Sequence, residues 1–175
     1  LRAAGLDVHG LSVGGAHPRK RAYAVELRRS IAAHGLGAGI TLAGDRADLR
    51  EILSLSDLAF SLATEPEAFG RVAVEAQAMG TPVVVSDLGA VPETVLVPPR
   101  VPPSERTGWC VPPGDAAALA ESIAMALSMG ASALEALNAR ARRHVEAHFS
   151  LEKMVSETLD TYVAVLEQDR RGASH

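Results

Sequence analysis

Short apolar runs alternate with longer helical patterns along this chain, and this alternation constrains the fold more than any other feature. Residues 82–86 read PVVVS, apolar along nearly their whole length. Unbroken apolar runs are typical of strands in a parallel sheet, because helices then cover both faces of the sheet. The sequence therefore predicts an α/β fold, a Rossmann-like parallel sheet with helices on both faces. Functional sites are expected at the carboxyl ends of its strands.

The expected elements follow from periodicity and from the glycines and prolines that end each run. A segment with four prolines, residues 95–107, is expected to be an exposed loop insertion. The length fits one domain over residues 1–169, followed by a frayed tail at 170–175. The expected strands are 9–14, 40–43, 58–62, 82–86 and 108–111, and the expected helices are 20–34, 48–56, 70–79, 116–129, 131–148 and 150–167.

Charge and cysteine content exclude several classes of protein. The formal net charge is −4, from 17 Lys and Arg against 21 Asp and Glu, which argues against a dedicated nucleic-acid binder. The one cysteine, Cys110, allows no intramolecular disulfide and fits a reducing compartment, so a cytoplasmic location is expected. No apolar run approaches the ~20 residues that a bilayer span requires.

The stretch at residues 65–80, EPEAFGRVAVEAQAMG, carries the chemistry. Gly70 allows a tight turn before a helix whose first amides have no intrahelical partner, which makes a ready site for phosphate. Glu67 lies before this helix start and Glu75 about one turn into the helix, and carboxylates accept hydrogen bonds from sugar hydroxyls. The pair indicates either a ligand with phosphate and polyol parts or acidic residues that only stabilise the helix start.

Four segments in order resemble retaining nucleotide-sugar glycosyltransferases of the GT-B fold, known as group 1 or family 4. Residues 67–75 match the E-x7-E signature, and residues 76–85 resemble the segment that follows it. Residues 86–93, SDLGAVPE, are similar to the family's S-D-x-G-G-x-P-E loop, with Ala90 in place of one glycine. Residues 107–115, TGWCVPPGD, are similar to its T-G-x-L-V-P-P-G-D stretch. The resemblance covers nearly the whole chain.

The resemblance implies that the chain is the donor-binding, C-terminal half of such an enzyme, which transfers a hexosyl group to an unknown acceptor. By position, Glu67 would bind the donor sugar and act as the catalytic residue, and Glu75 would bind the ribose. No metal or other cofactor is expected, because amides and cations stabilise the departing diphosphate. The other implied contacts with the donor are Phe69, Gly70, Arg71, Val72, Gly89 and Ala90, with Gly44, Asp45 and Arg46 near the base.

The sequence departs from the family pattern at its beginning. The donor domain of the family opens with a strand and a G-R-x-x-x-x-K-G type loop, which this sequence does not contain. Arg19, Lys20 and Arg21 lie elsewhere and are interpreted as a solvated helix start. We therefore expect that the N-terminal acceptor domain and the cationic loop are absent, and that this chain alone has little or no transferase activity. Peripheral membrane association through the absent half stays open, as do the base, the sugar and the acceptor.

Three further interpretations stay open. The chain could instead be a non-catalytic or regulatory Rossmann-like module that binds a nucleotide or nothing. His144 and His148 have a spacing that can bind zinc, but no third ligand is evident and surface histidines are expected. The apolar face of the last helix, around Leu159 and Tyr162, could support self-association.

Overall fold

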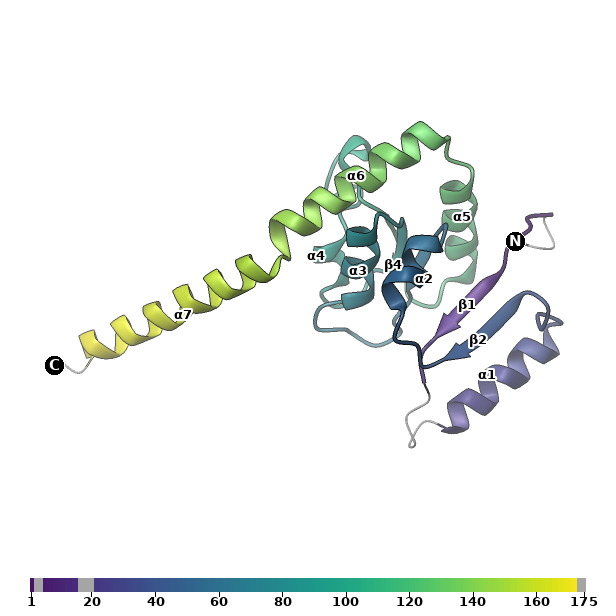
Figure 1. Ribbon diagram of the computed structural model, residues 1–175, viewed down its shortest axis with the longest axis horizontal. Coiled ribbons are helices and arrows are strands. Elements are labelled where there is room, and N and C mark those ends of the chain that lie inside the picture. The colour runs from purple at the N-terminus through teal and green to yellow at the C-terminus, as the bar shows by residue number, and fades with distance from the viewer. Residues whose placement is uncertain (2–4, 16–20, 173–175) are drawn as a thin grey trace. The chain divides into compact units, whose positions relative to one another are not determined.

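The computed structural model describes residue 1 and residues 5–15 and 21–172 (Figure 1). Arg19 and Lys20, interpreted above as a solvated helix start, lie outside the described residues. The chain forms two compact units, Leu1–Ile52 and Leu53–His175.

The first unit contains one parallel strand pair and its crossover helix. Strand β1 (Gly10–Val13) pairs with β2 (Ile40–Gly44), with Gly10 opposite Ile40. Helix α1 (Arg21–Ala33) connects them, as a parallel pair requires. Helix α2 (Leu49–Leu55) then leads from the first unit into the second.

The second unit is built on a three-stranded parallel sheet. Its order is β3 (Ala59–Ser61), β4 (Val83–Ser86), β5 (Trp109–Val111), so β4 is central. All four residues of β4 are buried. This confirms the prediction of a buried strand from the apolar run, since the central strand is covered on both faces.

Helices cover both faces of this sheet. Side chains alternate along β4, so Val83 and Val85 pack in one core cluster and Val84 in the other. Helix α3 (Arg71–Met79) and the short α4 (Val91–Thr94) contribute to the first cluster. Helices α5 (Ala116–Leu127) and α6 (Ala131–His148) contribute to the second (Figure 1). The prediction of a Rossmann-like α/β fold is confirmed.

The proline-rich segment 95–107 is only partly the exposed insertion that its composition predicts. Val95 and Val97 are buried, at 0% and 7% exposure, because both side chains pack in the first core cluster. The Leu96 amide donates to Thr107 Oγ1 (2.9 Å), and the Thr107 amide donates to the Leu96 carbonyl (2.9 Å). Residues 98–100 and 102–105 are exposed and include a 3-10 turn at Pro103–Glu105. The two ends of the segment are therefore fixed, and only its middle is a surface loop.

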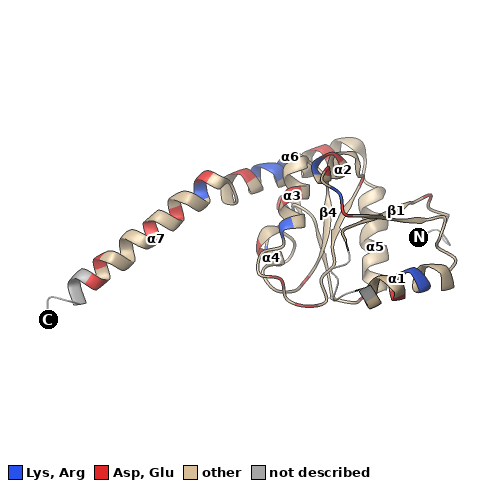
Figure 2. Ribbon diagram, turned by 60° about the horizontal axis from the view of Figure 1, so that its bottom comes forward, with Lys and Arg blue, Asp and Glu red and all other residues tan. Residues whose placement is uncertain are grey.

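Helix α7 (Leu151–Gly172) follows α6 and includes residues 170–172 of the expected tail. Its described charges are mostly acidic (Figure 2). No single helix among the described residues has the length and apolarity to cross a bilayer, although the bent pair Ala116–Leu127 and Ala131–Asp169 passes that test together. The exposed apolar side chains of α7 are Leu151, Met154, Val155, Leu159, Tyr162, Val163, Val165 and Leu166.

Candidate functional site

The predicted site residues of the second unit meet at the carboxyl ends of β3 and β4. Glu67 and Phe69 lie in the loop from β3 to α3, and both are exposed. Gly89 and Ala90 lie in the loop from β4 to α4. Parallel neighbouring strands bring their carboxyl ends to one edge, so the two loops are adjacent.

Gly89 holds the two loops in backbone contact. Its φ is +62°, and a Cβ there would lie 2.5 Å from the Glu67 carbonyl oxygen and 2.7 Å from the Glu67 nitrogen. The Ala90 amide donates to the same Glu67 carbonyl at 3.0 Å. Only glycine fits at position 89 without moving a neighbour. The position of Glu67 therefore depends on the loop that follows β4.

Helix α3 begins at this junction. Gly70 is its N-cap, with φ +79°, and no side chain among the described residues caps this end. A Cβ at Gly70 would lie 2.8 Å from Val91 Cγ2, so α3 starts directly against α4. The buried Gln77 then ties the two helices, because its Nε2 donates to the carbonyls of Ala73 (3.1 Å) and Thr94 (2.9 Å). The first amides of α3 are left to a ligand or to solvent.

Glu75 is paired with a cation in this structure. Arg71 Nη2 lies 2.9 Å from Glu75 Oε1, one helical turn away, and the two side chains are 81% and 38% exposed. An exposed i, i+4 pair is weak, so a ligand can compete for the Glu75 carboxylate. Val72, at the same helix start, is 46% exposed. The N-terminal half of α3 therefore presents a guanidinium and an apolar side chain in its first turn and a carboxylate one turn further along.

An aromatic cluster connects the Glu67 loop to the end of α6. The Phe69 ring lies 5.5 Å from the Phe149 ring in an edge-to-face arrangement, and Phe149 in turn contacts His144 (5.6 Å). The His144 and His148 rings are 4.9 Å apart. Burial, and next the neighbouring His148, lowers the pKa of His144 below its usual value. His148 is exposed, as expected, but His144 is half-buried and not the expected surface histidine, since the Phe149 ring packs against it.

Metal ligands do not gather here. Within the described ranges, no group of three or more His, Cys, Asp and Glu side chains could hold a metal ion. Cys110 lies in β5 and is half-buried, and burial raises the pKa of its thiol to about 11. This thiol is therefore protonated and unreactive near neutral pH.

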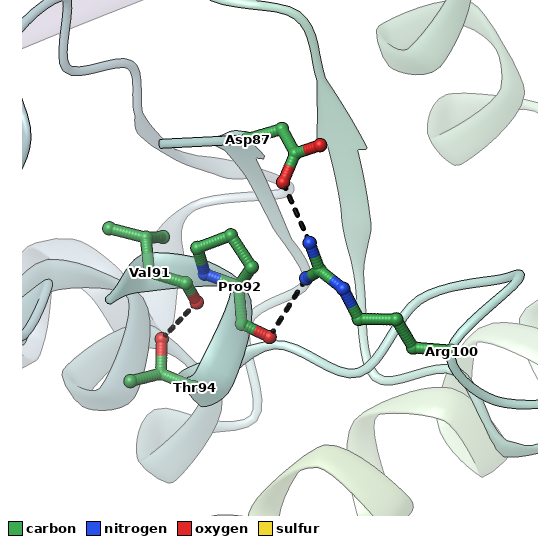
Figure 3. Close-up of polar contacts among 5 residues, drawn as sticks. All are labelled: Asp87, Val91, Pro92, Thr94 and Arg100. Carbon is green, nitrogen blue, oxygen red and sulfur yellow. Dashed lines mark hydrogen bonds and ion pairs between the residues drawn. The ribbon is translucent and has the colours of Figure 1, made fainter. Parts of the chain in front are cut away.

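Arg100 was not singled out by the sequence, although it is the one cation between the proline pairs of PPRVPP. Its Nη2 donates to Asp87 Oδ1 (2.9 Å) and its Nη1 to the Pro92 carbonyl (3.2 Å), as Figure 3 shows. It borders a hollow of about 520 Å³ lined by Asp87, Leu88, Gly89, Pro92, Glu93, Leu96 and Arg100.

The residues expected near the base belong to the first unit. Gly44 ends β2 with φ +69°, and Asp45 and Arg46 are exposed. The Arg46 guanidinium pairs with Asp48, which raises the pKa of Arg46 and lowers that of Asp48. A Cβ at Gly15 would overlap the Asp45 carboxylate, so the two loops of this unit touch. The assignment of these residues to the base stays a prediction.

Most of this chain is similar to known proteins. The family described as "Glycosyl transferases group 1" matches residues 6–144. N-acetyl-alpha-D-glucosaminyl L-malate synthase from Bacillus anthracis is 32% identical over 129 residues, which are 74% of this chain and 32% of that protein. The chain thus spans about a third of the length of this curated relative.

Solved structures agree with this match. A glycosyltransferase from Rickettsia africae is 30% identical, with a TM-score of 0.85, over 94% of this chain and 42% of that chain. HepE from Anabaena, solved in complex with UDP-glucose, is 28% identical, with a TM-score of 0.76, over 88% of this chain and 41% of that chain. The order of the motifs, the fold and the match over residues 6–144 lead to one conclusion: the chain belongs to the group 1 glycosyl transferases.

Proposed function

We propose that this chain binds the nucleotide-sugar donor of a retaining glycosyltransferase that transfers a hexosyl group. The observation that carries the proposal is the junction at which Gly89 fixes the backbone of Glu67 beside the uncapped start of α3. HepE, which shares the fold, was solved in complex with UDP-glucose. A diphosphate on the first amides of α3 would have carboxylates on either side of it, suited to sugar and ribose hydroxyls.

Each residue has a role in this proposal. The amides of Arg71 and Val72 bind the diphosphate, assisted by the helix dipole. Glu75 leaves its pair with Arg71 and accepts hydrogen bonds from the ribose, which frees the guanidinium for the phosphate. Glu67 accepts hydrogen bonds from the donor sugar and is the catalytic carboxylate.

The proposed chemistry needs no metal. Charge grows on the diphosphate as the bond to the sugar breaks, and fixed amide dipoles at a helix start stabilise that charge. Arg71, which is 81% exposed, supplies a cation at the same end. Binding of the donor is therefore expected to be the same in EDTA as in magnesium.

Calorimetric titration tests the proposal. The chain is titrated with UDP, GDP and ADP and with UDP-glucose, GDP-mannose and ADP-glucose, in EDTA and in magnesium. One base should bind, and its sugar form should bind more tightly. Binding of a nucleotide with no gain from the sugar would favour a non-catalytic nucleotide-binding module, and absence of all binding would refute the proposal.

Two variants separate the carboxylates. Glu75→Ala should weaken nucleotide and nucleotide sugar equally, by about tenfold, the value of one charge-assisted hydrogen bond in an exposed site. Glu67→Ala should remove only the gain from the sugar. Glu121→Ala, at an exposed glutamate of α5, is the matched control and should change neither affinity. Unchanged nucleotide binding in Glu75→Ala would overturn the ribose contact.

Retention is tested on the product. In a protein that joins this chain to an acceptor-binding domain, proton NMR of the first product formed should show the anomeric configuration of the donor. Inversion would refute the retaining assignment while leaving donor binding intact.

A further inference from the structure

The two ends of the loop after β4 are joined by one side chain from the proline-rich segment. Asp87 begins this loop directly after β4, and Pro92 lies in the first turn of α4. The Arg100 guanidinium reaches both, with Nη2 on Asp87 Oδ1 (2.9 Å) and Nη1 on the Pro92 carbonyl (3.2 Å) (Figure 3). A loop clamped at both ends has fewer accessible conformations than a loop held at one end.

The clamped loop is the one that positions Glu67. Between its two ends lie Gly89, whose backbone touches the backbone of Glu67, and Ala90, whose amide donates to the Glu67 carbonyl at 3.0 Å. A shift of the loop would therefore move Glu67. The described contacts of Glu75 are different, since this residue lies on α3 and pairs with Arg71.

Arg100 itself stands on a fixed base. Val95 and Val97 are buried in the core cluster that contains Val83 and Val85, and the Arg100 amide donates to the Val97 carbonyl at 3.0 Å. Leu96 and Thr107 close the base of the segment with two hydrogen bonds. The Arg100 side chain therefore connects the loop after β4 to a segment that is anchored in the core.

The ion pair between Arg100 and Asp87 is partly exposed to solvent. The Arg100 and Asp87 side chains are 48% and 54% exposed, and pairs so exposed contribute little to global stability. The effect of the pair should therefore be local. It should appear in the order of the loop and in whatever that loop positions.

We propose that Arg100 is a positioning residue for the donor sugar: it clamps the loop 87–92 and thereby fixes Glu67, without contributing to the binding of the nucleotide. This inference rests on the proposed function and deepens it, because it assigns the proline-rich segment to the sugar end of the same site.

The test compares a nucleotide with its sugar in variants of position 100. Arg100→Gln should weaken the binding of UDP-glucose, or of GDP-mannose or ADP-glucose if that is the donor bound, by about threefold, because an exposed ion pair is weak. It should leave the affinity for the nucleotide alone unchanged. Arg100→Lys keeps the charge and one hydrogen bond and should restore part of the affinity for the sugar. Lys153→Gln is the matched control, since it breaks another exposed ion pair of 2.9 Å on α7 and should change neither affinity.

Equal weakening of both ligands in Arg100→Gln would mean general damage and would overturn the inference, as would no weakening of either. Hydrogen exchange supplies a readout that needs no ligand. The Ala90 amide should exchange faster in Arg100→Gln than in the unmodified chain, and an unchanged rate would also overturn the inference. If the unmodified chain gains nothing from the sugar, the proposed function fails, and the Ala90 amide still decides whether Arg100 holds the loop.

Discussion

Replacing Gly89 by alanine tests the central contact of the site. A Cβ there would lie 2.5 Å from the Glu67 carbonyl oxygen and 2.7 Å from the Glu67 nitrogen, and both atoms belong to backbone that cannot rotate away. The loop after β4 would have to lift off the Glu67 loop. The chain offers a matched control in Gly114, which has φ +76° and no atom within 4 Å of its would-be Cβ.

The two variants share the backbone strain and differ in the overlap. An alanine at positive φ costs about 1–2 kcal/mol, offset by about 0.4–1 kcal/mol from the stiffer unfolded chain. Gly114→Ala should therefore lower the free energy of unfolding by about 1 kcal/mol. Gly89→Ala adds the overlap and the loss of the hydrogen bond from Ala90 to Glu67, about 0.5–1.5 kcal/mol for the bond alone. Its total should be about 2–3 kcal/mol.

Urea unfolding followed by the fluorescence of Trp109 measures both. This is the one tryptophan of the chain, it is 4% exposed, and it lies in β5 of the second unit, so it reports on the unit that holds the site. Gly89→Ala should lower the midpoint by about 1 M urea, for a slope of about 2 kcal/mol/M. It should also reduce the gain in affinity that the sugar provides. If Gly89→Ala costs no more than Gly114→Ala, the close approach of the two loops is refuted.

Two further predictions concern titratable groups of the second unit. Burial lowers the pKa of His144 in the folded chain, so the unfolded chain binds the proton more tightly. The free energy of unfolding should therefore be highest above pH 6.5 and should fall as the pH drops below that value. In unfolding curves followed by Trp109 fluorescence, His144→Gln should reduce this pH dependence. Cys110, whose thiol has a pKa raised to about 11, should react with iodoacetamide at pH 8 much more slowly in the folded chain than in urea; equal rates would contradict its burial.

Much of the fold was predictable because its signals are local. The run PVVVS identified β4, the fully buried central strand, and the glycines at the ends of α3 marked where that helix begins and ends. The short α4 was missed because Val91–Thr94 is one turn, too brief for any period to appear. The prediction of an exposed loop was wrong for Val95 and Val97, because it was based on the four prolines of residues 95–107 and not on the alternating positions of these two valines.

The sequence by itself determined most of the elements, the α/β class and the candidate site residues that lie within one stretch of chain. Glu67, Gly70 and Glu75 share a loop and a helix, so their proximity follows from backbone geometry. Only the tertiary structure decided that Gly89 rests on Glu67 and that Arg100 joins Asp87 to Pro92. These contacts link residues that are 8–22 positions apart in the sequence. Such residues come together in space only when β3, β4 and the core valines pack. A periodic pattern records which face of one element is buried, but it carries no information about which side chain of another element will lie against it.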